Sequence, residues 1–219
     1  MIRDDTQLQR EIIDELNWDP AVKGAEIGVA VRKGVATLSG HVDSYARKYA
    51  AERAAERVSG VRALADNVKV KLPMSHSRTD TEIAHAAIAA LDWDVEVPDQ
   101  AITLRVEDGS VFLEGSVEWQ YQKLAAERDV RYLMGVRAVA NMIKVEPKKA
   151  SSVDVERRIT DALRRGAEKD AAGITVEASD GRVTLRGHVR SWNERADAER
   201  AAWGAPGVAV VEDRLVVGK

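Results

Sequence analysis

The chain has 219 residues and no cysteine, which excludes disulfides, thiolate metal sites and thiol nucleophiles. Hydrophobic residues make up 45% of it and charged residues 32%, a composition typical of a folded protein rather than a disordered one. The net charge of −3 is unevenly spread: residues 1–73 carry 12 basic and 11 acidic groups, residues 74–147 carry 7 and 13, and residues 148–219 carry 14 and 12. No segment is basic enough to hold phosphates as a nucleic-acid-binding domain does, so we expect no nucleic-acid partner.

The first seven residues, Met1 to Gln7, lack the apolar core of a signal peptide. No stretch of the chain reaches the roughly 18 apolar residues of a membrane span. We therefore predict a cytoplasmic protein, with a peripheral position at the inner membrane as the further possibility.

One glycine pattern occurs three times along the chain. Two glycines lie six residues apart and a third follows 20 residues later, at Gly34, Gly40 and Gly60; at Gly109, Gly115 and Gly135; and at Gly181, Gly187 and Gly207. Matching glycines are separated by 75 and then 72 residues, which indicates an internal repeat. We predict three domains, over residues 1–73, 77–147 and 151–219.

Each repeat begins with an amphipathic helix. Apolar residues recur every four positions, a spacing that places them on one helix face. They are Leu8, Ile12 and Leu16; Ile83, Ala87 and Leu91; and Val155, Ile159 and Leu163. The first helix must end near Trp18, because the proline at position 20 disfavours helix at the residue before it.

A β-hairpin follows each helix. Apolar residues alternate in the first copy at Ile27, Val29 and Val31, and a two-residue turn follows. The turns are Lys33-Gly34, Asp108-Gly109 and Asp180-Gly181. The resulting register pairs Ile27 with Gly40, Ile102 with Gly115 and Ile174 with Gly187, which places a glycine on the apolar face. We expect a helix to cross close to this bare backbone, with contact to a ligand as the alternative.

A second helix and a third strand complete the repeat. The helix is predicted over residues 45–58, 120–133 and 192–203, with a face of small residues formed in the first copy by Ala51, Ala54, Ala55 and Val58. Gly60, Gly135 and Gly207 end this helix or turn the chain after it. The fold class is therefore α+β: three tandem α-β-β-α-β domains, each with a small three-stranded mixed sheet packed on two helices.

This pattern resembles the BON domain, the bacterial OsmY and nodulation domain. The residues that carry the likeness are the apolar-Gly-x-Val-x-Leu-x-Gly-x-Val core and the ending Gly-Val-x-x-Val-x-Asn-x-Val. The third copy departs most, with Asp213 where asparagine is expected. The glycines of the signature are Gly40, Gly115, Gly187, Gly60, Gly135 and Gly207. The resemblance implies a non-catalytic module linked to phospholipid binding, to envelope maintenance and stress, and in one group to potassium binding.

Trp18 and Trp93 are the candidate ligand-binding residues. They occupy the same position, two residues after the last helix leucine, where the third copy has Arg165. An exposed tryptophan there would be suited to a membrane interface, because its ring is both apolar and polar. We expect instead that both rings close the end of the core, since large aromatic residues are mostly buried.

Other aromatic and titratable residues have simpler interpretations. Tyr45, Trp119, Tyr121 and Trp192 gather at the start of the second helix, and we expect them to pack between repeats, with the edge of a second surface patch as the alternative. His41, His76, His85 and His188 lack the spacing of metal ligands, so no metal site or cofactor is expected. The shared Ala-Glu-Arg triplets, such as Glu52-Arg53, are expected on a solvated helix face.

No cluster of acid, base and nucleophile points to an enzyme. We therefore predict a non-catalytic binding protein of three BON-like domains that contacts an anionic phospholipid surface or a partner protein and acts in stress response. The alternative is a cytoplasmic protein that binds potassium or senses cations through backbone carbonyls. The sequence leaves the oligomeric state open.

Overall fold

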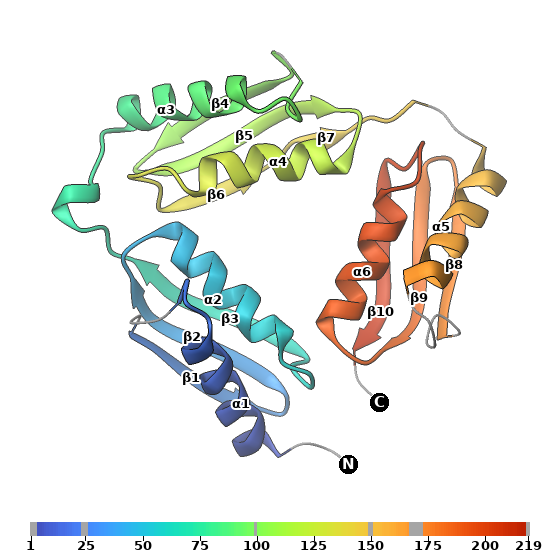
Figure 1. The fold of residues 1–219 in the computed structure, drawn as a ribbon, viewed down its shortest axis with the longest axis horizontal. Coiled ribbons are helices and arrows are strands. Elements are labelled where there is room, and N and C mark those ends of the chain that lie inside the picture. Colours follow the sequence, from blue (N-terminus) through green and yellow to red (C-terminus); the bar gives the residue numbers. More distant parts are fainter. Residues whose placement is uncertain (1–3, 23–25, 99, 149–150, 167–172, 218–219) are drawn as a thin grey trace.

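The computed structural model describes residues 4–22, 26–98, 100–148, 151–166 and 173–217. The same unit of helix, hairpin, helix and strand occurs three times along the chain (Figure 1). Repeat 1 contains α1 (Asp5–Trp18), β1 (Glu26–Arg32), β2 (Val35–Val42), α2 (Tyr45–Arg57) and β3 (Ala63–Val70). Repeat 2 follows a short 3-10 turn, η1 (Met74–His76), and contains α3 (Asp80–Trp93), β4 (Ile102–Glu107), β5 (Ser110–Val117), α4 (Gln120–Arg131), β6 (Ala138–Asn141) and β7 (Lys144–Val145). Repeat 3 contains α5 (Ser152–Gly166), β8 (Ile174–Ser179), β9 (Arg182–Val189), α6 (Trp192–Trp203) and β10 (Val210–Val217).

Each repeat has its own mixed sheet. The hairpin strands are antiparallel, and the third strand pairs in parallel with the second, so the order is β1-β2-β3 in repeat 1 and β8-β9-β10 in repeat 3. In repeat 2 the third strand is interrupted, and β6 and β7 pair in succession with β5. The predicted fold class, three α+β units with small mixed sheets, is confirmed.

The predicted hairpin register is also confirmed, but the reason for the glycine in the second strand differs from the one predicted. Ile27 pairs with Gly40, Ile102 with Gly115 and Ile174 with Gly187. The three glycines have φ angles of 120°, 132° and 132°, a region that side-chain-bearing residues rarely adopt. A Cβ on Gly40 would lie 2.0 Å from the carbonyl oxygen of Glu26 on the neighbouring strand. The expectation that a helix crosses here is wrong, because the close neighbour is the backbone of β1.

An aspartate at the start of the first helix holds the hairpin turn in repeats 1 and 2. The Asp5 carboxylate accepts hydrogen bonds from the amides of Lys33 (2.7 Å) and Gly34 (3.0 Å). Asp80 accepts in the same way from the amides after β4, at 2.9 and 2.8 Å. Ser152 stands at the equivalent place in repeat 3. The helix and the hairpin are thereby fixed to each other independently of the core.

The two helices of each repeat pack on one face of its sheet. In repeat 1 the apolar stripe of α1 (Leu8, Ile12 and Leu16) and the small face of α2 (Ala51, Ala54 and Ala55) are buried, as the sequence predicts. Equivalent residues form a separate core in repeats 2 and 3. The described residues therefore form three cores rather than one. None of the helices in its described part is long and apolar enough to cross a membrane.

The three repeats are arranged around a triangle with α2, α4 and α6 on its inner side (Figure 1). Two corners are formed by aromatic residues that begin a second helix. Tyr45 of repeat 1 packs against the core of repeat 2. Trp192 of repeat 3 packs against the core of repeat 1 and donates its Nε1–H to the carbonyl of Val61. The expectation that these aromatic residues pack between repeats is confirmed for Tyr45 and Trp192.

Candidate binding site: two apolar tips

The tryptophans predicted to close the core lie outside it. Trp18 is 83% exposed and Trp93 is 87% exposed, at the C-terminal ends of α1 and α3. The expectation of burial is therefore wrong for both. The cores close without them, because Val22 and Val97, four residues further along the chain, are buried at 3% and 7% exposure.

The chain makes the same turn after each tryptophan. The amide of Val22 donates to the carbonyl of Asp19 at 3.0 Å, and the amide of Val97 donates to the carbonyl of Asp94 at 3.0 Å. In the first turn the Asp19 carboxylate accepts from the amide of Ala21 (3.0 Å), the arrangement of an Asx turn. In the second, the Asp94 carboxylate accepts from the amide of Glu96 (2.8 Å). We call residues 18–22 tip 1 and residues 93–97 tip 2.

A second apolar side chain accompanies each tryptophan. Pro20 of tip 1 and Val95 of tip 2 occupy the same position in their turns and are exposed, Val95 completely. The proline suits its place because its fixed φ matches the second position of a turn. Each tip therefore presents an indole and an aliphatic group on a turn that is hydrogen-bonded beneath them.

In tip 1, one arginine ties the turn to the second helix. Arg57 of α2 donates to Asp19 and to Glu15, both at 2.7 Å. The hydrogen bond from Arg57, followed by that from the Ala21 amide, lowers the pKa of Asp19. The aspartate therefore stays ionised and uses one carboxylate oxygen for the turn and the other for the helix.

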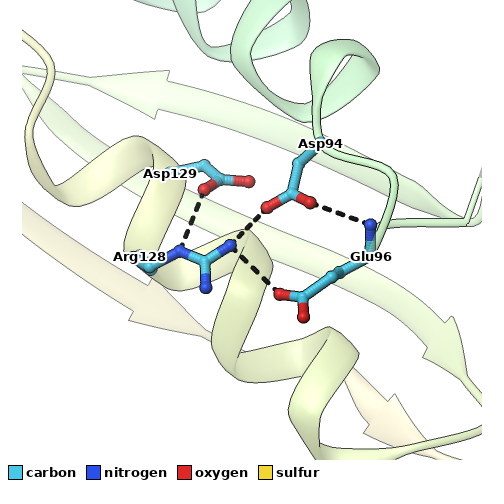
Figure 2. A network of polar contacts seen from close by, with 4 residues as sticks. All are labelled: Asp94, Glu96, Arg128 and Asp129. Carbon is cyan, nitrogen blue, oxygen red and sulfur yellow. Dashed lines mark hydrogen bonds and ion pairs between the residues drawn. The ribbon is translucent and has the colours of Figure 1, made fainter.

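Figure 2 shows the corresponding network of tip 2. Arg128 of α4 donates to Asp94, to Glu96 (3.2 Å) and to Asp129 (3.4 Å). The Glu96 amide contributes most to lowering the pKa of Asp94, and hydrogen bonds from Asp129 and Arg128 add to it. Burial raises the pKa of Asp129, and the neighbouring Asp94 carboxylate raises it further. Three carboxyl groups thus surround one guanidinium.

Of the four residues that hold the tips, the sequence singled out only Arg128, as part of a shared Ala-Glu-Arg triplet expected on a solvated helix face. One signal was available: both tryptophans are followed directly by aspartate, a residue that favours turns. The arginines gave no such signal, because Arg57 and Arg128 do not occupy equivalent positions. Counted from the matching glycines, Arg128 is equivalent to Arg53, one helical turn before Arg57.

All three repeats match one known family over nearly their whole length. The BON domain profile matches this chain three times, over residues 4–71, 79–147 and 151–219. The chain belongs to the BON-domain family. Its BON repeats are similar to the osmotically-inducible protein Y of Escherichia coli (strain K12), with 30% identity over 147 residues that cover 65% of this chain and 73% of that protein.

Two solved structures also match the BON chain, with low identity. One is CdsD, a structural protein of the type III secretion system of Chlamydia trachomatis, with 16% identity, coverage of 96% of this chain and 91% of that chain, and a TM-score of 0.27. The other is the C-terminal domain of CdsD, with 16% identity, coverage of 98% and 99%, and a TM-score of 0.25. At these TM-scores neither likeness carries an argument about this protein.

The BON repeats differ at a polar pair between the second helix and the third strand. Glu52 of α2 and Asp66 of β3 are both carboxylic acids, and Lys48 forms an ion pair with Asp66 at 2.6 Å. Burial, aided by a hydrogen bond with Asp66, raises the pKa of Glu52 to about 7. The triplet Ala-Glu-Arg was expected to be solvated, and for Glu52 this is wrong.

The same position holds an amide in repeat 2. Asn141 donates to the Lys123 carbonyl (2.8 Å) and to the carboxylate of Glu127 (3.2 Å). Repeat 3 has a carboxylic acid at this position, Asp213, which forms an ion pair with Arg195. Burial raises the pKa of the nearby Glu199. The family asparagine is therefore replaced in repeat 1 as well as in repeat 3, because Asp66 and not Asn67 occupies the position of Asn141.

The remaining predicted residues form no site of their own. His41 lies on the exposed side of β2 and contacts Glu26 at 3.3 Å. In the described part of the chain no group of three or more histidine, aspartate or glutamate side chains is placed to hold a metal ion. The residue at the tip position of repeat 3, Arg165, belongs to a region whose side chains lie outside the described residues.

Proposed function

We propose that this BON protein is a non-catalytic, stress-associated protein that binds a phospholipid membrane surface by inserting tips 1 and 2. The observation that carries the proposal is the exposure of Trp18 and Trp93, 83% and 87%, at equivalent places in two repeats. The stress association is supported by the likeness to an osmotically-inducible protein.

The chemistry of the tips favours an interface rather than a pocket. Tryptophan is enriched at membrane–water interfaces, where its apolar ring and its N–H group each find a suitable environment. Here each indole is accompanied by Pro20 or Val95, and the last two amides of each turn, in residues 21–22 and 96–97, are already hydrogen-bonded. Insertion would therefore bury apolar surface without leaving these amides unpaired.

The magnitude of the gain suggests a weak and reversible contact. Burying about half of the roughly 200 Å² of an indole stabilises the bound state by about 2–3 kcal/mol for each tip. Two tips on one chain add avidity only when both reach the same surface.

Charge around the tips argues for apolar insertion as the main contribution. Arg57 faces two carboxylates and Arg128 faces three, so neither tip carries an excess of positive charge. An anionic headgroup layer, which the sequence suggests as partner, would gain little from these groups. We expect binding to neutral phosphatidylcholine vesicles to be at least as strong as binding to anionic ones.

Vesicle co-sedimentation tests the proposal. The wild-type chain is compared with the double variant Trp18→Ala, Trp93→Ala, on phosphatidylcholine vesicles with and without phosphatidylserine. We expect the double variant to lose most of the bound fraction. Met74→Ala is the matched control, because Met74 is 96% exposed but lies in the segment between repeats. Equal binding by wild type and double variant, or binding by neither, would exclude the lipid surface and leave a protein partner as the target.

The potassium alternative stays a prediction. A site made of backbone carbonyls would stabilise the native state through bound ion, so melting temperatures in potassium and sodium chloride at equal ionic strength would differ. Identical melting temperatures would argue against it.

A further inference from the structure

The two formed corners of the triangle use the same parts of the repeat. At the corner between repeats 1 and 2, the residue that begins α2, Tyr45, lies against the core of repeat 2, near the start of β6. At the corner between repeats 3 and 1, the residue that begins α6, Trp192, lies against Val61, just before β3. Tyr45 and Trp192 are equivalent residues, each five after the second hairpin glycine. We call this contact, from the start of a second helix to the start of a third strand, the head-to-tail junction.

Additional contacts support the junction between repeats 1 and 2. Tyr45 is sufficiently enclosed that burial, and then the carboxylates of Glu52 and Glu127, raise its pKa. One turn further along α2, the ring of Tyr49 lies 3.4 Å from the guanidinium carbon of Arg131 in repeat 2. Arg131 is only 8% exposed. This junction is thus a closely packed interface that includes a cation–π contact.

The two junctions use two of the three helix starts and two of the three strand starts, so one helix start and one strand start are left over. Repeat 3 supplies its helix start to repeat 1, and repeat 1 supplies its helix start to repeat 2. What remains is the helix start of repeat 2 and the strand start of repeat 3. In Figure 1 these two ends, the beginning of α4 and the beginning of β10, are found at the third corner of the triangle.

Both unused surfaces carry exposed apolar side chains. At the start of α4, Tyr121 is 51% exposed and stacks with Trp119, and Leu124 is 52% exposed. Leu124 is equivalent to Tyr49 of the formed junction. Gln120 stands in place of Tyr45 and Trp192, so Tyr121 and Leu124 supply the apolar surface at the start of α4. Leu124 is exposed, whereas the equivalent Tyr49 of the formed junction is partly buried. At the start of β10, Val210 is 40% exposed, and the equivalent Ala63 and Ala138 of the formed junctions are exposed as well. Val210 therefore differs from them in presenting a larger apolar group, not in its exposure.

We infer that the start of α4 is a docking surface for the start of β10 of the same chain, so that a third head-to-tail junction closes the three BON repeats into a ring. Heterologous contacts of one kind form a closed ring when the rotation between successive units permits it. Three units around a triangle meet that condition with one chain. The short segment between β7 and α5 keeps the two surfaces at a high effective concentration, which favours this occupant over a second copy.

Spin-label distances test the closure without altering the junction residues. The chain has no cysteine, so labels attach only where cysteines are introduced. Ser39, Glu114 and Arg186 are equivalent exposed positions on the second strands, and Lys69, Lys144 and Val216 are equivalent exposed positions on the third strands. One labelled pair, Glu114→Cys with Val216→Cys, spans the third corner. The matched pairs Ser39→Cys with Lys144→Cys and Arg186→Cys with Lys69→Cys span the two formed corners.

We expect the distance distribution across the third corner to be as narrow as those across the formed corners and to have its maximum within their spread. Adding Tyr121→Ser and Leu124→Ser should broaden and lengthen only the third distribution, while Ile88→Ser, at 49% exposure on α3, should change none. A broad third distribution in the otherwise unchanged chain would overturn the closure. So would a third distance that disappears on dilution with unlabelled chain, because the docking partner would then be a second copy.

Discussion

Repeats 1 and 2 place the same apolar tip at the end of the same helix but hold it with arginines from different positions. Arg57 lies one helical turn beyond the position that Arg128 occupies in repeat 2, yet both reach the aspartate that follows the tryptophan. The two repeats also fill the polar position of the third strand differently, with Asp66 in one and Asn141 in the other. The turn and its aspartate are common to both, whereas the groups that hold them vary.

The largest expected effect tests what the two repeats share. Gly40→Ala and Gly115→Ala should each destabilise their repeat by about 3 kcal/mol or more, because a Cβ would meet backbone at a positive φ. Thermal unfolding measures the loss. Gly28→Ala is the control, since its Cβ would lie 3.2 Å from the Ser39 hydroxyl at an ordinary φ, and it should cost less than about 1 kcal/mol. Equal losses at Gly28 and Gly40 would show that the backbone conformation is not the cause.

The next prediction is that the same Glu→Gln substitution changes stability in opposite directions in repeats 1 and 2. The pKa of Glu52 is raised to about 7, so the carboxyl group keeps its proton up to about pH 7 in the folded state, whereas in the unfolded state it loses the proton near its ordinary pKa of 4.5. The stability of repeat 1 should therefore fall as pH rises from about 4.5 to about 7. Glu52→Gln should remove this fall and stabilise repeat 1 at pH 8 by about 1 kcal/mol, a reduced figure because the side chain is partly exposed.

The equivalent substitution in repeat 2 should do the reverse. The carboxylate of Glu127 accepts from Asn141 (3.2 Å) and from Arg131 (2.6 Å). Glu127→Gln should therefore destabilise repeat 2 by about 1–2 kcal/mol at pH 8. Denaturant unfolding of both variants at pH 5 and pH 8 checks the pair of predictions. Stabilisation by both substitutions, or by neither, would contradict the contrast between the two sites.

A smaller effect tests whether the two arginines have one role. Arg57→Ala and Arg128→Ala should each cost about 0.5–1 kcal/mol, because the ion pairs are partly exposed. Both should also weaken vesicle binding, since the tip would no longer be held in the conformation that presents its tryptophan. Arg53→Ala is the control, because Arg53 pairs with Glu56 within α2 and does not reach tip 1. Loss of stability without loss of binding would show that the arginines do not prepare the tips for insertion.

The smallest change is a direct exchange between the repeats. Asp66→Asn gives repeat 1 the residue of repeat 2 and removes the carboxylate that helps to raise the pKa of Glu52. It also removes the ion pair with Lys48, so the net change at pH 7 should stay within about 1 kcal/mol. The pH dependence between pH 5 and pH 7 should become shallower. An unchanged slope would mean that burial alone raises the pKa of Glu52.

Much of the fold could be predicted because its signals are local and repeated. The two-residue turns that end in glycine predicted the register, and the four-residue spacing of Leu8, Ile12 and Leu16 identified the buried face of α1. The reason why position 40 requires glycine could not be predicted in the same way. The pairing with Ile27 shows which face the residue lies on, but the positive φ depends on how closely β1 and β2 approach each other.

The tips show the limit of prediction from residue type. Trp18 and Trp93 were expected inside because large aromatic residues usually are, but a smaller residue four positions later, Val22 or Val97, fills the end of each core. Whether a side chain is covered depends on the path of the turn after the helix. That path is set by Asp19 or Asp94 and by an arginine more than 30 residues further along the chain.

The attachment of α1 at both ends has a mechanical consequence. Asp5 fastens the beginning of the helix to the hairpin turn, and Arg57 fastens its end through Asp19. A helix of 14 residues is about 21 Å long, so the two fastenings lie on opposite sides of the domain. A force on the Trp18 side chain would therefore be transmitted along α1 to the hairpin turn at the other end of the domain, because the helix is attached at both ends.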